Sequence, residues 1–300
     1  MISVTALALL VSPLLGSVGA HALPPTERSN SVSPMTATEE SAYTPYALFA
    51  RAAYCPAAET GTWSCGASCS AIPNFNTYGS GGYVGYDPTF FNAVVVAHQG
   101  ISATNILSDI TDADFFLTPL DSRLFPGLAP GIEVHNGFQN VHANTATTLL
   151  AAVQNAMAAT GSTHIVLTGH SIGAAVALLD AVYLPLHLPS ATTFSTAVFG
   201  LPRVGNTAFA SYVDGHTTNF AHITNKHDPV PTLPGRFLGF THPSNEKHIV
   251  TTGLKDGNWY ACAGQDNTNR DCSTGAVPNL FSGNEADHNG PYGDIEMGSC

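Results

Sequence analysis

The sequence predicts an α/β fold in which a mainly parallel central sheet is flanked by helices. Short apolar runs rich in β-branched residues alternate with longer alanine-rich stretches, as expected when strands and helices follow one another. The run Ile165–Leu167 leads into Gly169-His170-Ser171-Ile172-Gly173, after which Ala174–Leu179 has the composition of a helix. Strand, tight turn and helix in this order project Ser171 from the edge of a sheet.

The other elements are predicted from the same patterns. Helical patterns occur at 44–53, 102–114 and 138–159, and strand patterns occur at 93–97, 196–199 and 221–224. Loops with short strands are expected at 60–88, and a mixed end region at 237–240 and 248–252. Because no internal repeat or long linker divides residues 43–300, we expect them to form a single domain.

The amino-terminal segment has the composition of an export signal. Ile2–Leu15 is mostly apolar, is too short to span a membrane and is followed by the cleavage pattern Ala20-His21-Ala22. We therefore expect a signal peptide at 1–22, a linker or short pro-segment at 23–42, and a secreted, extracellular mature chain with no integral membrane segment.

Six cysteines agree with export, because an even number in a secreted chain suggests three disulfides. Proximity in the sequence favours Cys65 with Cys69 and Cys262 with Cys272, which leaves Cys55 for Cys300. No C-x-x-C pair indicates zinc, and the polar loop 266–271 lacks the ligand spacing of a calcium site. We therefore predict no metal.

The charge balance excludes several kinds of partner. Nine basic and 21 acidic residues give a formal net charge of −12, which disfavours nucleic acid and anionic membrane surfaces. With 44% hydrophobic and 10% charged residues, the chain can bury a sizeable core. A neutral substrate fits this composition best.

Ser171 is the candidate nucleophile. A serine hydroxyl attacks only when a base removes its proton, so the side chain must project where a histidine can reach it. Gly169 and Gly173 let the turn close, and the amide of Ile172 at the helix start points to where an oxyanion would form. The alternative is an ordinary glycine-rich turn, which the flanking strand and helix disfavour.

Asp228 is the candidate acid. On sheets of this kind the partners follow the serine in the order acid, then histidine, and Asp228 comes just after the predicted strand 221–224. An Asx turn before Pro229 is the alternative role. Asp180 is a rival, but it lies on the helix leaving Ser171 and should point away from the strand ends.

Three histidines compete for the role of base. His248 lies in a strand-like segment and His242 precedes a proline in a turn, whereas His288 lies in a glycine-rich loop that can carry an imidazole over the sheet edge. A lone histidine is more often structural. The residues alone favour His288 without excluding the other two.

Several segments together resemble the fungal secreted triacylglycerol lipases of the class 3 family, particularly the basidiomycete members. In order, these segments are A-R-A-A-Y-C-P, V-V-V-A-H-Q-G, T-D-A-D-F-F-L, V-H-N-G-F, G-H-S-I-G-A-A, G-L-P-R-V-G, N-K-H-D-P-V-P and D-H-N-G-P-Y. The resemblance implies an α/β-hydrolase-like fold and a Ser171, Asp228 and His288 triad. It also implies hydrolysis of triacylglycerol at a lipid–water interface. We expect a monomer without a cofactor.

The resemblance also implies a short helical lid after the strand that ends in H-Q-G. The segment Ser102–Asp114 carries apolar residues at helical spacing, namely Ile106, Leu107 and Ile110. An ordinary helix packed on the core is the alternative for this segment, and the residues alone favour it.

One position departs from the family pattern. Ile101 stands where the family usually has Thr or Ser, so a supporting hydroxyl is missing from the oxyanion hole unless Ser102 supplies it. The backbone amides of Ile101 and Ile172 remain as donors, which predicts an active but slower enzyme. Two alternatives stay open: a feruloyl or short-chain esterase on the same scaffold, and a non-catalytic relative that binds lipid or cell wall.

Overall fold

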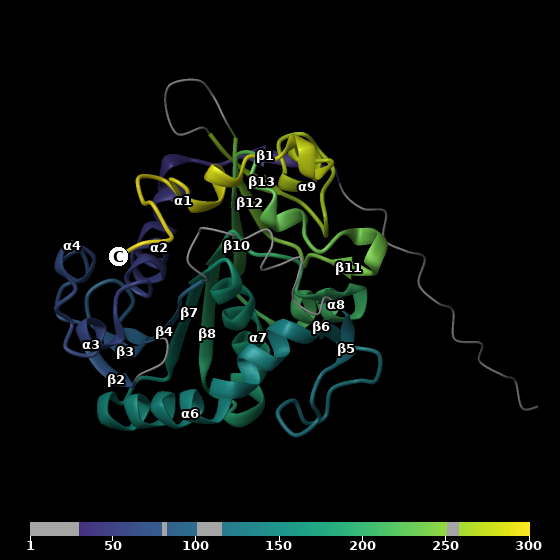
Figure 1. Cartoon of the computed structure of the whole chain (residues 1–300). Helices are drawn as coiled ribbons and strands as arrows, with labels where there is room; N and C mark the ends of the chain where they lie inside the picture. Colours follow the sequence, from purple (N-terminus) through teal and green to yellow (C-terminus); the bar gives the residue numbers. More distant parts are fainter. Residues whose placement is uncertain (1–29, 80–82, 101–115, 251–257) are drawn as a thin grey trace, which may run out of the picture.

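A computed structural model describes residues 30–79, 83–100, 116–250 and 258–300 of the chain. Within these residues a main sheet and a smaller second sheet form (Figure 1). The main sheet contains β1 (Val32–Pro34), β2 (Asn76–Gly79), β3 (Tyr83–Asp87), β4 (Ala93–His98), β7 (His164–His170), β8 (Thr193–Phe199), β10 (Phe220–Asn225), β12 (Glu246–Ile249) and β13 (Trp259–Cys262). The second contains β5 (Leu117–Pro119), β6 (Glu133–His135), β9 (Gly205–Asn206) and β11 (Phe240–Thr241).

The main sheet is parallel at its centre and antiparallel at both edges. Its described strands follow the order β1-β13-β12-β10-β8-β7-β4-β3-β2. The run from β12 through β10, β8 and β7 to β4 is parallel, and the outer pairs are antiparallel. The apolar runs of β4 and β7 are buried on both faces, as central parallel strands require. The predicted fold class is confirmed.

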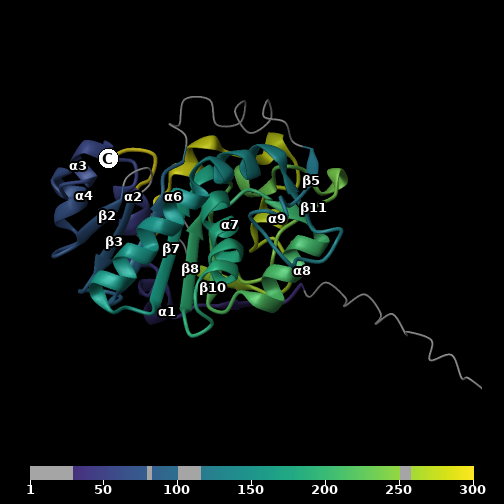
Figure 2. The same ribbon diagram turned by 90° about the horizontal axis from the view of Figure 1, so that it is seen from below.

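Helices cover both faces of this sheet, as the two views together show (Figures 1 and 2). The helices are α1 (Ala37–Ser41), α2 (Thr44–Ala52), α3 (Ala57–Thr60), α4 (Gly66–Ser70), α6 (Asn136–Thr160), α7 (Ile172–His187), α8 (Thr207–His216) and α9 (Ser273–Ala276). Val94 and Val96 of β4 join the core cluster with α6 and α7, whereas Val95 joins the cluster with α2. The two-residue alternation of a strand therefore gives each face its own core.

Four short 3₁₀ segments also occur within the described residues. They are η1 (Val230–Thr232), η2 (Arg236–Leu238), η3 (Leu280–Ser282) and η4 (Glu285–Asn289). None of the helices in the described residues is both long and apolar enough to cross a membrane.

The structure differs from the expected linker at 23–42 in its second half. Val32–Pro34 forms the edge strand β1, which pairs antiparallel with β13, and α1 follows with a capping box between Thr36 and Glu39. The composition of this segment predicted a linker because it is rich in serine and proline. An edge strand tolerates these residues, since one side of it forms no backbone hydrogen bonds with a neighbouring strand. Residues 1–22, and with them the predicted signal peptide, lie outside the described residues.

Three disulfides link the cysteines in the arrangement that their spacing favoured. They join Cys55 to Cys300, Cys65 to Cys69 and Cys262 to Cys272. The first of them holds the carboxyl terminus next to the end of α2, where Figure 1 places it.

Candidate active site

Ser171 occupies a strained turn between β7 and α7. Its φ of 61° and ψ of −129° are rare for a residue with a side chain, and such strain at a strand-to-helix turn typically marks a functional position. Its amide donates to the Phe199 carbonyl at 3.0 Å, which ties the turn to the end of β8. A Cβ on Gly173 would lie only 2.5 Å from the Gln99 carbonyl oxygen, so this position requires glycine.

Asp228 and His288 are joined by a hydrogen bond, although 60 residues separate them. Asp228 follows the end of β10, His288 lies in η4, and each is 1% exposed. The Nδ1–H of His288 donates to Asp228 Oδ2 at 2.8 Å, while the Val230 amide donates to Oδ1 at 2.9 Å. This bond fixes the tautomer, so Nε2 of His288 can accept a proton.

The Ser171 hydroxyl and Nε2 of His288 are both free of hydrogen bonds among the described residues. Both atoms are buried. Both residues contact the end of β8: Ser171 bonds Phe199, and a Cβ on Gly200 would lie 2.8 Å from His288 Cε1. The structure therefore brings the predicted nucleophile and base to one strand end.

The competing histidines have other partners. His242 Nε2 donates to the Pro231 carbonyl at 2.7 Å, and His248 Nδ1 lies 2.7 Å from the Thr224 hydroxyl. Burial lowers the pKa of both imidazoles. Neither is hydrogen-bonded to Asp228 in the part of the chain that the structure describes.

Asp180, the rival acid, lies beneath the site and not in it. Its carboxylate oxygens lie 2.6 Å from Nε2 of His98 and 3.0 Å from Nε2 of His142. Burial raises the pKa of Asp180, but the hydrogen bonds from His142 and His98 outweigh it, so the pKa is lowered overall. Asp180 thus joins the end of β4 to α6 and α7, and leaves Asp228 as the carboxylate on His288.

The predicted oxyanion donors are only partly described. Ile172 is the first residue of α7, so its amide has no intrahelical partner and is available to a ligand. Gly100 approaches the nucleophile closely, because a Cβ there would lie 2.8 Å from Ser171 Cβ. Ile101, the next residue, lies outside the described residues, as do the lid residues Ser102, Ile106, Leu107, Ile110 and Asp114.

A buried chain of hydrogen bonds connects three segments around the nucleophile. The Tyr54 hydroxyl lies 2.6 Å from Nδ1 of His170, and Nε2 of His170 lies 2.7 Å from the His288 carbonyl. A carbonyl only accepts, so Nε2 carries the proton and Tyr54 donates to Nδ1. Burial and the charge of His288 hold the pKa of His170 well below its usual value, which keeps this tautomer neutral.

Tyr54 also contacts the strand end that leads to Ile101. Burial raises the pKa of the Tyr54 hydroxyl, and a hydrogen bond with the Gly100 backbone opposes that rise. The two residues lie close together, because a Cβ on Gly100 would clash with the Tyr54 hydroxyl. One tyrosine thereby links Gly100, His170 and, through His170, the backbone of His288.

Comparison with known proteins indicates one family. The family model described as Lipase (class 3) matches residues 95–238. A protein named as a secreted mono- and diacylglycerol lipase of Malassezia globosa is 33% identical over 207 residues, which are 69% of this chain and 66% of that protein. The chain is similar to the class 3 lipase family. The predicted resemblance is confirmed.

Solved structures extend the likeness over nearly the whole chain. Lipase II from Rhizopus niveus matches with a TM-score of 0.77 at 28% identity, covering 90% of this chain and 100% of that one. A triacylglycerol lipase described as having a serine protease triad at its catalytic centre matches with a TM-score of 0.75 at 26% identity, covering 89% and 99%. By sequence, the matched region spans only 66% and 63% of two Malassezia relatives' own length.

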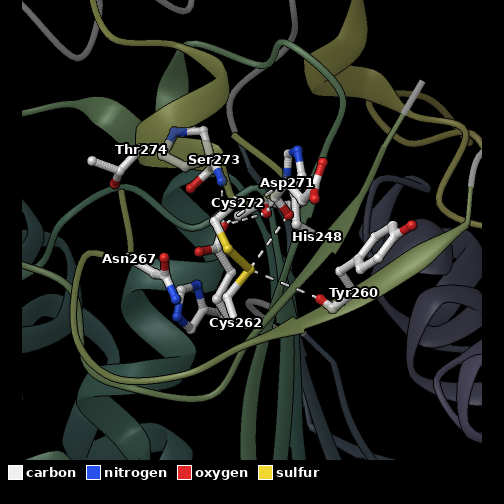
Figure 3. Close-up of polar contacts among 12 residues, drawn as sticks. His248, Tyr260, Cys262, Asn267, Asp271, Cys272, Ser273 and Thr274 are labelled. Atoms are coloured by element: carbon white, nitrogen blue, oxygen red, sulfur yellow. Dashed lines mark hydrogen bonds and ion pairs between the residues drawn. A yellow bond between two sulfur atoms is a disulfide. The ribbon is translucent and has the colours of Figure 1, made fainter. Parts of the chain in front are cut away.

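The groups of potential metal ligands that contain cysteine are not free to bind a metal. Among the described residues, two groups bring three potential metal ligands together: Cys55, Cys65 and Cys300, and Glu246, Cys262 and Cys272. All of these cysteines are in disulfides. Figure 3 shows the two cysteines of the second group, with the Cys262–Cys272 bond closing the loop and Ser273 next to it. Glu246 instead accepts from the Ser273 amide at 2.9 Å and the Thr224 hydroxyl at 2.7 Å.

Sequence reasoning missed Tyr54 and His170. His170 stands at the variable position of the G-x-S-x-G pattern, and Tyr54 lies next to Cys55, yet no local pattern connects them because 116 residues separate them. The pairing of Cys55 with Cys300 was the one available signal, since it ties the end of α2 to the segment after His288.

Proposed function

We propose that the chain is a secreted lipase that hydrolyses carboxylic esters of acylglycerols, with Ser171 as nucleophile, His288 as base and Asp228 as the acid that orients His288. One observation carries the proposal. The 2.8 Å bond from His288 Nδ1 to Asp228 leaves Nε2 free, and the equally free Ser171 hydroxyl lies at the same strand end. This is the arrangement that acyl transfer by serine requires.

The reaction proceeds in two halves. His288 Nε2 takes the Ser171 proton as the oxygen attacks the ester carbonyl, and the imidazolium then protonates the leaving alkoxide, which departs as the alcohol. Water next attacks the acyl-enzyme, transfers a proton to Nε2 and releases the fatty acid while Ser171 is restored. The buried carboxylate of Asp228 stabilises the imidazolium in both halves.

The negative charge on the substrate oxygen needs two donors. The Ile172 amide at the start of α7 is one, and we propose the Ile101 amide as the second. Because Ile101 has no hydroxyl, kcat of Ile101→Thr should rise, up to the ~10²-fold effect of a single donor. An unchanged kcat would count against a missing third donor.

We propose triacylglycerol as the preferred substrate. The main alternative substrate, or rival, is a mono- or diacylglycerol. The rival is favoured by the Malassezia relatives, which are named as mono- and diacylglycerol lipases. Fatty-acid release at constant pH from tri-, di- and monoacylglycerols of one acyl chain decides between them. Ser171→Ala is the blank, and release no faster than the blank from all three would overturn the proposal.

The dependence of rate on substrate concentration separates the lipase from an esterase. A rise in rate when the triacylglycerol passes its solubility limit supports a lid that opens at a lipid surface, whereas smooth saturation below the limit points to a short-chain or feruloyl esterase. Labelling of Ser171 by a serine-directed phosphonate would exclude the alternative that the chain is a non-catalytic lipid- or cell-wall-binding protein. We also propose that the enzyme is secreted and works as a monomer. Its presence in the culture medium tests the first point, and the molar mass of the secreted protein from analytical ultracentrifugation tests the second.

A further inference from the structure

A large pocket lies beside the proposed active site and contains none of the triad residues. Its volume is about 1010 Å³. One wall comes from residues 232–238, which begin four residues after Asp228, and the other from residues 268–280, which end eight residues before His288. The pocket therefore adjoins the two loops that carry the acid and the base.

Three of the chain's nine basic residues line this pocket: Arg203, Arg236 and Arg270. Arg203 is 2% exposed and fully engaged, because Nε donates to Asp266 at 2.8 Å, Nη1 to the Pro234 carbonyl at 3.0 Å and Nη2 to the Thr274 hydroxyl at 3.2 Å. Its bonds reach both walls. Arg203 thus holds the pocket open in a fixed shape, and Asp266 neutralises its charge.

Arg236 and Arg270 are different, because both are exposed and unpaired. Within the described residues, neither guanidinium has a carboxylate within ion-pair distance or a hydrogen-bond partner. Arg270 lies in the loop that the Cys262–Cys272 disulfide closes, and Figure 3 labels Asn267 and Asp271 of this loop. In a chain of formal net charge −12, two unpaired guanidinium groups on one pocket leave a local site for an anion.

Part of the pocket lining is apolar and fits a hydrocarbon chain. Leu233, Val277 and Leu280 line it, and Phe237 on its rim is 90% exposed. The neighbouring Phe281 is also fully exposed. A site that combines apolar walls with unpaired cations selects an amphiphilic anion, since the chain buries apolar surface while the head group pairs with arginine.

We propose that this pocket binds the anion of a fatty acid, the acid product of the proposed hydrolysis, with its carboxylate between Arg236 and Arg270 and its chain along Leu233 and Val277. The inference rests on the proposed function only for the source of the ligand. Arginine favours this head group because its planar fork pairs with both carboxylate oxygens. The net charge of the chain disfavours anions elsewhere on its surface, so the pocket would be the place where product is held on leaving the site.

Direct binding tests the proposal without any turnover. Decanoate, which stays monomeric at millimolar concentration, is titrated into the Ser171→Ala protein at pH 8 by calorimetry, and decan-1-ol serves as the neutral ligand of equal chain length. Arg236→Gln combined with Arg270→Gln should weaken decanoate at least about tenfold, because hydrogen bonds to charged groups are lost. The affinity for decan-1-ol should change little.

A matched control is available in Arg123→Gln. Arg123 is also exposed, but it is paired with Asp121 at 2.6 Å and lies outside the pocket, so its loss should leave decanoate binding unchanged. A second arm distinguishes the pocket from the cleft above Ser171. Wild-type protein labelled on Ser171 with an alkyl phosphonate, which fills that cleft, should still bind one decanoate.

Four results would overturn the proposal. These are no decanoate binding, equal decanoate affinity in the double arginine variant, loss of binding after phosphonate labelling, and a dimer of the free protein that Phe237→Ser dissociates. The last result would assign the same face to a second copy of the chain. Because both arginines are exposed, the variants should keep the wild-type unfolding midpoint, which confirms that they fold. Absence of hydrolysis by wild-type protein would refute the proposed function. It would not affect the test of decanoate binding, which needs no turnover.

Discussion

The Tyr54 hydroxyl donates to His170 Nδ1 at 2.6 Å, and the opposite nitrogen of the same ring holds the backbone carbonyl of His288 at 2.7 Å. The residue before the proposed nucleophile Ser171 thus positions the proposed base His288. His170 has no reactive role in this arrangement. It is a neutral structural side chain, a strut, in which both ring nitrogens are hydrogen-bonded. The centroid of its ring lies 4.5 Å from the centroid of the His288 ring.

Tyr54→Phe removes the donor from this strut. We expect the free energy of unfolding to fall by about 1–3 kcal/mol, because a buried acceptor is left unsatisfied. We also expect kcat to fall by up to ~10²-fold with little change in KM, since His288 is displaced while the substrate surface is intact. Steady-state kinetics with denaturant unfolding measures both. Tyr86→Phe removes a hydroxyl that, among the described residues, bonds Asn92 at the surface; it is the control and should leave kcat unchanged.

Asp228→Asn should lower kcat by about 10⁴-fold while the protein still folds, because an amide no longer fixes the His288 tautomer that leaves Nε2 free. Asp294→Asn removes an exposed carboxylate near the chain end and should have wild-type activity. Ester hydrolysis by both variants decides the matter. A loss of less than tenfold in Asp228→Asn would remove this carboxylate from the mechanism.

Gly173→Ala should destabilise the protein by about 1–3 kcal/mol and lower activity, because its Cβ would meet the backbone carbonyls of His98 and Gln99 and push β4 away from Ser171. Gly215→Ala is matched to it. Gly215 lies in α8 and nothing lies within 4 Å of a Cβ there, so alanine should be neutral or stabilise by up to about 1 kcal/mol. Thermal unfolding of the two variants gives the comparison, and similar midpoints would contradict the close approach.

The disulfides should differ in their effect on stability according to the loop each one closes. Replacing Cys55 and Cys300 by serine opens a connection across 245 residues and should cost about 5 kcal/mol, whereas replacing Cys65 and Cys69, only 4 residues apart, should cost about 2 kcal/mol. Urea unfolding of the two double variants measures the difference. Because Cys55 follows Tyr54, kcat should fall only in the first variant.

Stability should fall as the solution becomes acidic. Burial lowers the pKa of four fully buried imidazoles below the usual value: His170, His222, His242 and His248. Below about pH 6.5 the unfolded chain binds protons at these positions and the folded chain does not, so their contribution is complete above that pH and is lost as pH falls. The unfolding free energy should drop by up to about 1.4 kcal/mol per pH unit for each such group. A flat profile between pH 7 and 5 would show that these histidines take up protons without unfolding.

The sequence by itself determined the features that local patterns encode. The β-branched runs specified the central strands, and G-x-S-x-G between a strand and a helix located Ser171 before any partner was known. These predictions succeed because backbone propensity and a two- or 3.6-residue period are properties of neighbouring residues. Cysteine spacing worked for the same reason at Cys65 and Cys69, and it left one remaining pair.

Only the tertiary structure decided which distant side chains meet. It placed His288 on Asp228 and gave His242 and His248 other partners, and it turned part of the expected linker into β1. It also gathered Arg236 and Arg270 around one pocket in an acidic chain. Such contacts join segments tens to hundreds of residues apart, so no periodicity records them. They are fixed by where the sheet brings the loop ends together and by the requirement that buried polar atoms find partners.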